Sequence, residues 1–296
     1  MERKIDFLII GAQKSGTTTL YDWLAQHSDI FLPKTKEILY FAKDDFYKRG
    51  DAYLNVFYRE YNGEELVGGA YVHLMYFPYT ADRIHKYNPR MKCIVLLRNP
   101  VDRAYSAYWF ARRNGWERMK TIEDALREED RRKAGKYKEQ AELTYLSHGL
   151  YADQLQKYLS VFGEDRIKVV LTDEFRSSTE ETMDGILRFL GLASSAAELD
   201  LRLDSNRAST AIIPWVHSLI LSHDTWYKRL AREIVTDYAR ALFRENIMVR
   251  ILAMNAKAYV YPPMAPETRK AMVEYFKPHN ERLEKMIGKD LRSWDR

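Results

Sequence analysis

One lysine, one serine, one glycine and three threonines follow the first apolar run of the chain, in the order Lys14, Ser15, Gly16, Thr17, Thr18 and Thr19. The run itself, 7–10, has the composition of a strand buried on both faces, and 17–24 carries apolar residues at helical spacing. Gly11 and Gly16 allow a tight turn between strand and helix. Amide groups of such a turn and of a helix N-terminus favour an anion at one point. The segment therefore predicts a phosphate-binding loop.

The position of the lysine distinguishes this loop from that of nucleotide hydrolases. A Walker A loop has its lysine directly after the second glycine, whereas Lys14 comes two residues before Gly16. Nucleotide hydrolases also hold magnesium with an acid at the end of a neighbouring strand. The next strong strand pattern, 91–97, ends at Arg98 instead. We therefore expect a phosphate site that works without metal, and a magnesium-dependent kinase or ATPase is the disfavoured alternative.

A second phosphate-binding group is predicted where this strand ends. Arg98 can make a paired, charge-assisted contact with a phosphate. Pro100 stands where a helix can begin, and Ser106 then falls two turns into that helix, on the face near Arg98.

Together, 14–18 and 98–106 resemble the two donor motifs of sulfotransferases that use 3′-phosphoadenosine 5′-phosphosulfate (PAPS). The resemblance implies that the loop residues Lys14 to Thr19 bind the 5′-phosphosulfate, and that Arg98 and Ser106 bind the 3′-phosphate. It also implies 3′-phosphoadenosine 5′-phosphate (PAP) as the product and no metal. Lys14 would stabilise charge on the bridging oxygen.

The segment 34–41 resembles the heparan sulfate and bacterial branch of this family, in which a Lys-Glu or Asn-Glu pair precedes aromatic residues and the Glu is the catalytic base. Glu37 matches that Glu. A placed carboxylate contributes about 10² to 10⁴ in rate when it removes a proton. The chain departs from the branch at Leu39, where relatives often have His, and over 68–73, where they have a Glu-Lys-Thr-Pro-like segment. His73 in that segment is a second candidate for the base.

The C-terminal part returns to the family pattern. Residues 255–264 resemble the loop that covers the adenosine, with Lys257 as a candidate phosphate contact, and 266–286 resembles the last amphipathic helix. We expect one α/β domain over 1–296, a three-layer P-loop-like domain with a central parallel sheet flanked by helices, and a helical insertion at about 194–254. Within the insertion, the amphipathic pattern at 214–250 fits a packed flap, an acceptor lid or a peripheral helix on a membrane surface.

Composition sets the broad class. The 47 Lys and Arg against 42 Asp and Glu give a net charge of +5, which suits an anionic co-substrate. The basic residues form no single stripe, so we expect no nucleic-acid partner. The single cysteine, Cys93, reads as a buried strand residue, and no disulfide can form within the chain. No apolar run approaches a membrane span and no leader precedes the first strand, so we expect a cytoplasmic protein, with peripheral membrane contact through 214–250 as the alternative.

The expected activity is transfer of a sulfuryl group from PAPS to an acceptor hydroxyl or amine. A glycan or glycolipid acceptor is favoured because the Glu37 segment resembles the carbohydrate branch. A small phenolic or natural-product acceptor, and a PAPS-binding protein without transfer activity, stay open. The charged segment 112–142 is interpreted as a solvated helix with Thr121 as its N-cap, or else as a border of the acceptor cleft. No pattern in the chain indicates an oligomeric state.

Overall fold

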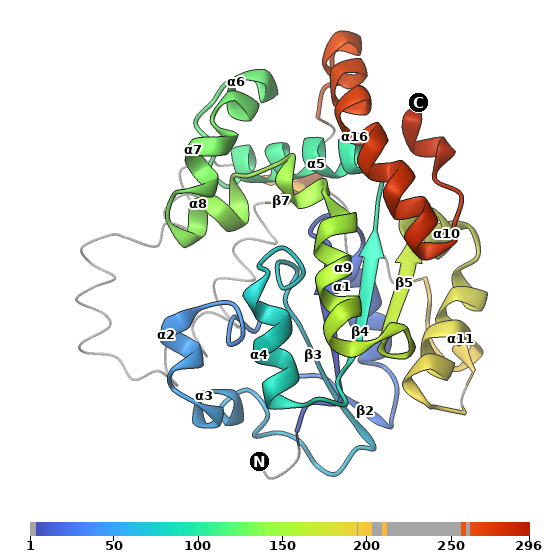
Figure 1. The fold of residues 1–296 in the computed structure, drawn as a ribbon. Coiled ribbons are helices and arrows are strands. Elements are labelled where there is room, and N and C mark those ends of the chain that lie inside the picture. Colours follow the sequence, from blue (N-terminus) through green and yellow to red (C-terminus); the bar gives the residue numbers. More distant parts are fainter. Residues whose placement is uncertain (1–3, 194, 203–208, 212–255, 259–260) are drawn as a thin grey trace.

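A central sheet of five parallel strands organises the chain (Figure 1). The computed structural model describes residues 4–193, 195–202, 209–211, 256–258 and 261–296, and side chains in all of these except 209–211 and 256–258. The strands are β1 (Phe7–Gly11), β2 (Ile30–Phe31), β3 (Leu66–Ala70), β4 (Lys92–Leu97) and β5 (Ile167–Leu171). They lie in the order β2-β3-β1-β4-β5, and every neighbouring pair is parallel. A separate antiparallel pair joins β6 (Ser209–Ala211) to β7 (Ala256–Ala258).

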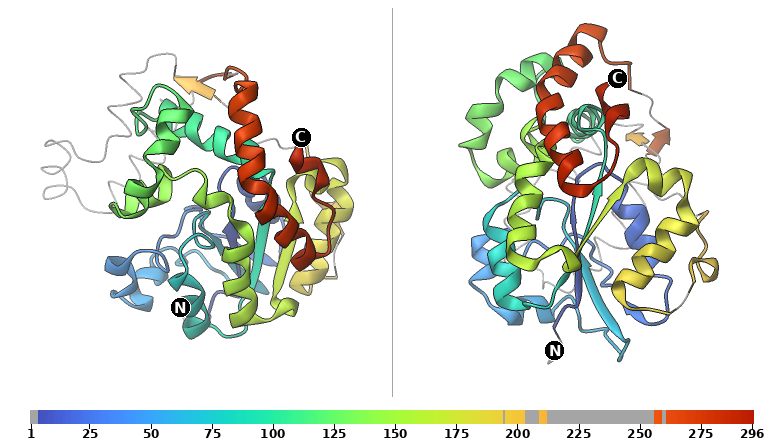
Figure 2. Two further views of the ribbon diagram at one scale, coloured as in Figure 1. Left: turned by 45° about the horizontal axis from the view of Figure 1, so that its top comes forward. Right: turned by 45° about the vertical axis from the view of Figure 1, so that its right-hand side comes forward.

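Helices cover both faces of the sheet, which gives three layers (Figures 1 and 2). Alternate residues of each strand enter different cores: Phe7 and Ile9 pack with α1 (Thr17–Leu24) and α11 (Thr179–Leu190). Leu8 and Ile10 belong to the opposite core, with α4 (Tyr79–Tyr87), α9 (Tyr151–Phe162) and the C-terminal half of α16 (Pro266–Ile287). The alternation of core faces explains why the strands read as continuous apolar runs in the sequence.

A third core lies beyond the carboxyl ends of the strands, where α5 (Pro100–Arg113) crosses the top of the sheet in Figure 1. It joins α5 to α6 (Ile122–Arg127) and to the N-terminal half of α16. The side chain of Asn99 caps α5 by accepting the amide of Val101 at 2.9 Å. The remaining helices are α2 (Asp44–Tyr47), α3 (Asp51–Asn55), α7 (Glu129–Lys133), α8 (Tyr137–Glu142) and α10 (Thr172–Ser177), with 3₁₀ turns at Ser147–Gly149, Glu164–Arg166, Ala196–Glu198 and Arg292–Asp295.

The three-layer parallel fold and the strands and helices around both donor motifs are confirmed. Strand β3 was missed, because its glycines break the apolar pattern. A side chain at Gly68 is sterically excluded: a Cβ there would lie 2.2 Å from Cζ of Phe7. The absence of a side chain at Gly68 thus leaves room for the ring of Phe7 from the neighbouring strand. The predicted insertion at 194–254 falls largely outside the described residues.

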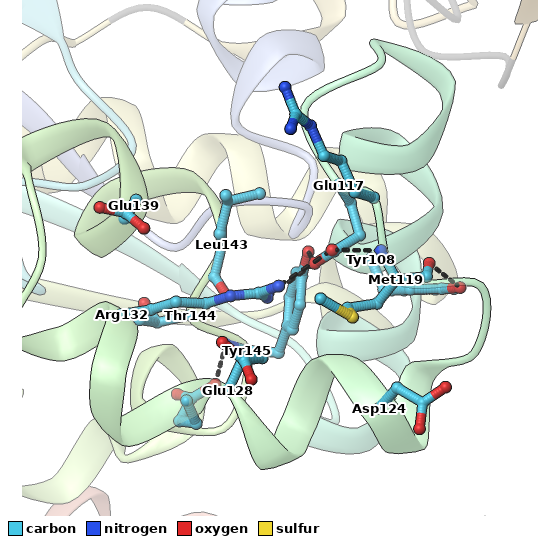
Figure 3. A network of polar contacts seen from close by, with 12 residues as sticks. Tyr108, Glu117, Met119, Asp124, Glu128, Arg132, Glu139, Leu143, Thr144 and Tyr145 are labelled. Carbon is cyan, nitrogen blue, oxygen red and sulfur yellow. Dashed lines mark hydrogen bonds and ion pairs between the residues drawn. The ribbon is translucent and has the colours of Figure 1, made fainter.

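The interpretation of 112–142 as a solvated helix is wrong. The segment contains the last two residues of α5 and then α6, α7 and α8, and it buries charge: Glu117, Glu129 and Arg132 are each less than a tenth exposed. Arg132 donates two hydrogen bonds to the Glu117 carboxylate, at 2.6 and 2.9 Å, and the hydroxyl of Tyr145 donates a third at 2.7 Å (Figure 3). A buried charge must be paired in this way to be tolerated. The predicted cap is confirmed, since the Thr121 hydroxyl accepts a hydrogen bond from the amide of Asp124 at the start of α6.

Candidate active site

The carboxyl ends of four strands open into one cavity of about 1110 Å³. Strand β1 runs into the phosphate loop, β3 into His73, β4 into Arg98 and β5 into Thr172. After β1 the chain forms β2 and β3 on one side of that strand, and it then crosses to form β4 and β5 on the other side. The point where the strand order reverses in this way is where open parallel sheets bind ligands. The cavity also receives Ser106 and Phe110 from α5, so both predicted donor motifs meet in it.

The phosphate loop has the backbone that the sequence predicts. Lys14 and Gly16 adopt left-handed conformations, with φ of 69° and 97°. No side chain caps α1, so its first amide groups remain available for an anion at the cavity. Two hydrogen bonds to carbonyl oxygens fix the loop: one from the Arg98 guanidinium to Lys14 at 3.2 Å, and one from the Thr172 hydroxyl to Ser15 at 2.9 Å.

The predicted loop residues divide between cavity and core. Lys14, Gly16, Thr17, Thr18 and Thr19 line the cavity. Ser15 is fully buried and does not line it. A direct contact of the Ser15 hydroxyl with a ligand stays a prediction, and its carbonyl serves as an anchor for the loop.

Lys14 is held in a strongly positive, water-poor place. Burial, followed by the charges of Arg113, Arg98 and Lys36, lowers the pKa of Lys14 to about 8. Its ammonium lies 4.5 Å from the ring centre of Phe110 on α5, a cation–π contact. An anion binds most favourably where several cations lie close together, because its charge offsets the repulsion among all of them. The electrostatics therefore favour a highly charged ligand such as a phosphate ester.

Glu37 lines the cavity beside the end of β3 and is oriented by its neighbours. Its segment pairs with the end of β3, since Ile38 donates its amide to the carbonyl of Ala70 at 2.9 Å. The carboxylate accepts the amide of Val72 at 3.2 Å and lies 3.3 Å from the ammonium of Lys36. The side chain is 40% exposed, so a substrate can reach it from the cavity. Glu37 can therefore act as an accessible, oriented base.

His73 lies in the cavity wall and at the start of a buried chain of hydrogen bonds. The Thr144 hydroxyl donates to the carbonyl of Gln140 at 2.5 Å, so it must accept from Nδ1 of His148, at 2.9 Å. Burial and the charge of His73 hold the pKa of His148 well below its ordinary value, so this ring is neutral. Nε2 of His148 therefore accepts from Nδ1 of His73, at 3.1 Å. Nε2 of His73 faces Glu142 at 3.4 Å, so both ring nitrogens of His73 have partners.

Sequence reasoning missed several side chains of this cavity. Glu142 on α8 accepts from Gln13 at 3.0 Å and from His73. Burial raises the pKa of Glu142, but the charge of His73 and a hydrogen bond from His73 outweigh burial and keep this pKa below its ordinary value. Trp116 enters from the loop that Glu117 anchors. Further cations are Lys36, Arg113 and Arg176. Only Lys36, directly before Glu37, carried a local signal; the others come from segments that the fold brings together.

Two predicted features lie at the limits of the described residues. The backbone of Lys257 is in β7, but its side chain lies outside the described part, and so does the amphipathic stretch 214–250. Within the described residues, no group of three or more His, Cys, Asp or Glu side chains is placed to hold a metal ion. None of the helices described there combines the length and apolar character needed to cross a bilayer.

Fold and site together define an α/β protein with a glycine-containing loop at the end of β1 whose geometry suits an anion, beside a cleft that contains an accessible carboxylate. The chain belongs to the sulfotransferase family: the sulfotransferase domain matches residues 4–205.

Several known proteins are similar over part or all of this chain. It is 24% identical over 304 residues to human bifunctional heparan sulfate N-deacetylase/N-sulfotransferase 3, a match over 99% of this chain and 31% of the relative. The membrane-associated sulfotransferase kil1 of Dictyostelium discoideum is 35% identical over 109 residues, 36% of this chain and 23% of the relative. The chain thus spans about a third of the first of these curated relatives, and less of the second.

A solved structure matches over the whole chain. The sulfotransferase from Alicyclobacillus acidocaldarius superimposes with a TM-score of 0.70 at 26% identity, over 99% of this chain and 100% of that one. The superposition therefore spans the central sheet and the segments 14–18 and 98–106 of this chain.

Proposed function

We propose that this sulfotransferase moves the sulfuryl group of PAPS to a hydroxyl or amine of a carbohydrate or glycolipid. The observation that carries the proposal is the meeting of three functional groups in one cavity: the phosphate loop, the Arg98 and Ser106 pair, and Glu37. A doubly phosphorylated nucleotide needs two separate anion sites, and the ends of β1 and β4 provide them side by side.

The donor side has a defined division of labour. The amides at the start of α1, the hydroxyls of Thr17 to Thr19 and the ammonium of Lys14 would hold the 5′-phosphosulfate, while Arg98 and Ser106 would hold the 3′-phosphate. Trp23 and Phe175, whose ring centres are 5.0 Å apart, line the same cavity and offer a flat apolar surface for the adenine ring of the nucleotide. When bound, PAPS supplies an activated sulfuryl group. Lys257 stays a candidate contact.

On the acceptor side, Glu37 removes the proton of the attacking hydroxyl or amine. The amide of Val72 and the ammonium of Lys36 orient the carboxylate, and its exposure lets an acceptor reach it. His73 is the weaker candidate, because its two nitrogens already have Glu142 and His148 as partners. Lys14 stabilises charge that develops on the leaving phosphate, and a preorganised donor of this kind contributes several kcal/mol, about 3, in a dry site.

The acceptor class rests on similarity and on the cavity wall. The human relative is named for N-sulfotransfer on heparan sulfate, a carbohydrate. Here Tyr71 and Trp116 present aromatic surface to the cavity, beside the carboxylates of Glu37 and Glu142. Aromatic faces with adjacent polar groups suit a sugar ring, and they also suit a phenol, which stays the alternative acceptor. Membrane association through 214–250 stays a prediction.

The test is a transfer assay with the purified chain and PAPS that carries labelled sulfate. Label should enter a member of a panel of glycans, glycolipids and phenols, and the Lys14→Ala variant should transfer none. Calorimetry should show that PAP binds at least about tenfold more tightly than AMP, since AMP offers nothing to Arg98. Equal affinity for PAP and AMP would refute the donor assignment. Tight PAP binding without transfer to any panel member would instead favour the binding protein without activity.

A further inference from the structure

The ammonium of Lys36 sits at the junction between the donor cradle and the base. Its Nζ lies 3.1 Å from the hydroxyl oxygen of Thr17, 2.9 Å from that of Thr18 and 3.3 Å from Oε1 of Glu37. An ammonium group has three N–H donors and no acceptor. All three donors of Lys36 therefore have partners, two in the phosphate-binding segment and one in the catalytic carboxylate.

The direction of these hydrogen bonds sets the direction of the threonine hydroxyls. Because Lys36 donates to both oxygens, the hydroxyl protons of Thr17 and Thr18 must point away from it. Both threonines line the cavity, and among the described residues neither hydroxyl donates to a protein acceptor. The two hydroxyls are thus prepared as donors for an anion in the cavity, before that anion arrives.

The family resemblance leads one to expect a further lysine in the segment after β3. Val72 and His73 stand in that segment instead, and only the amide of Val72 reaches the carboxylate of Glu37. The ammonium next to the other oxygen of Glu37 comes from Lys36. The Lys36 side chain is only 15% exposed, so its charge acts in a poorly hydrated place where hydrogen bonds to charged groups are strong.

We propose that Lys36 is a positioning residue that couples donor recognition to proton removal. It turns the hydroxyls of Thr17 and Thr18 into donors toward the 5′-phosphosulfate, and it holds the carboxylate of Glu37 toward the same point. The inference rests on the proposed function, because it assumes that PAPS occupies this cavity. It adds a residue, and a link between the two halves of the site, that the donor motifs do not contain.

The experiment compares Lys36→Met, which keeps the length of the side chain and removes its charge, with Lys34→Met. Lys34 is a matched control in the same segment, since its side chain is 72% exposed and pairs with Glu60 at the surface. Calorimetry with PAP should show binding at least about tenfold weaker for Lys36→Met and unchanged for Lys34→Met. The kcat of Lys36→Met should fall by a larger factor than its PAP affinity, because Glu37 also loses its partner. Lys36→Arg, which keeps the charge, should recover part of both losses.

A double-mutant cycle with Thr18→Val tests the coupling itself. Loss of the hydroxyl should weaken PAP binding in the wild-type chain and have little further effect once Lys36 is methionine. Additive effects of the two substitutions, or wild-type PAP affinity in Lys36→Met, would overturn the inference. These outcomes are separate from failure of the proposed function, because that failure would appear as weak PAP binding in the wild-type chain itself.

Discussion

The depressed pKa of Lys14 predicts that nucleotide binding weakens as pH rises through 8. Lys14 titrates at about 8 in the free protein because it is buried beside other cations. The phosphates of PAP, which lose their last proton near pH 6, would stabilise the charged lysine and raise its pKa in the complex. Binding therefore takes up a proton wherever free Lys14 is partly neutral, so affinity is highest below pH 8 and falls above it.

The size of the effect follows from the titration. Between about pH 7 and about pH 9, the charged fraction of a lysine with a pKa of about 8 drops from roughly nine-tenths to roughly one-tenth. Since PAP binds best to the charged form, its affinity should fall about tenfold over this range. At pH 8, binding should take up about half a proton.

Calorimetry of PAP binding in two buffers of different ionisation enthalpy measures both quantities. Lys14→Arg is the matched control, because a guanidinium stays charged throughout this range. All other titrating groups remain in that variant, so its affinity should be nearly constant with pH. A wild-type affinity that does not change between pH 7 and pH 9, or an equal fall in Lys14→Arg, would refute the electrostatic account of the loop.

Three further predictions address the other parts of the site. In a calorimetric comparison, Arg98→Lys should weaken PAP binding about tenfold more than AMP binding, because a lysine cannot form the paired phosphate contact and both nucleotides share the loss of the hydrogen bond to the loop; an equal loss for both nucleotides would contradict the role. Glu37→Gln should lower kcat by about 10² to 10⁴ with PAP affinity retained, and a larger kcat loss in His73→Ala would move the base to the histidine. Arg132→Met should lower the free energy of unfolding in urea by about 3 to 5 kcal/mol, because it leaves a buried carboxylate without its partner. Arg131→Met, at an exposed position with surface ion pairs, should lower it by less than about 1 kcal/mol. Similar losses in the two variants would contradict the buried pair.

The buried pair at Arg132 matters for function because of what it holds in place. Glu117 follows Trp116, which lines the cavity, and Arg132 also donates to the carbonyl of Leu143, directly after Glu142. One ion pair therefore anchors the chain next to Trp116 and next to Glu142, two side chains of the cavity that we propose to face the acceptor. Tight anchoring of residues around a reacting centre is what sustains catalytic geometry.

The sequence by itself determined those elements whose signals lie within a few neighbouring residues. A strand, a glycine turn and a helix follow one another over 7–24, and strand, arginine and capped helix follow over 92–113. Each is recognisable because apolar periodicity and glycine or proline placement act within a few residues. These local patterns also indicated Lys14, Arg98 and Ser106, whereas Glu37 was predicted from the resemblance of its segment to the heparan sulfate branch. The structure brings all four into one cavity.

Only the tertiary structure decided what these residues meet. The ammonium of Lys36 contacts two threonines in a segment nearly twenty residues earlier, and His73 contacts Glu142 at the end of α8 and His148 just beyond that helix. Charges such as Arg132 read as solvated in the sequence and are buried in the fold. The physical reason is that parallel strands bring their carboxyl ends to a common edge whatever their separation along the chain. Contacts made at that edge depend on strand order and on long connections, and no local pattern encodes them.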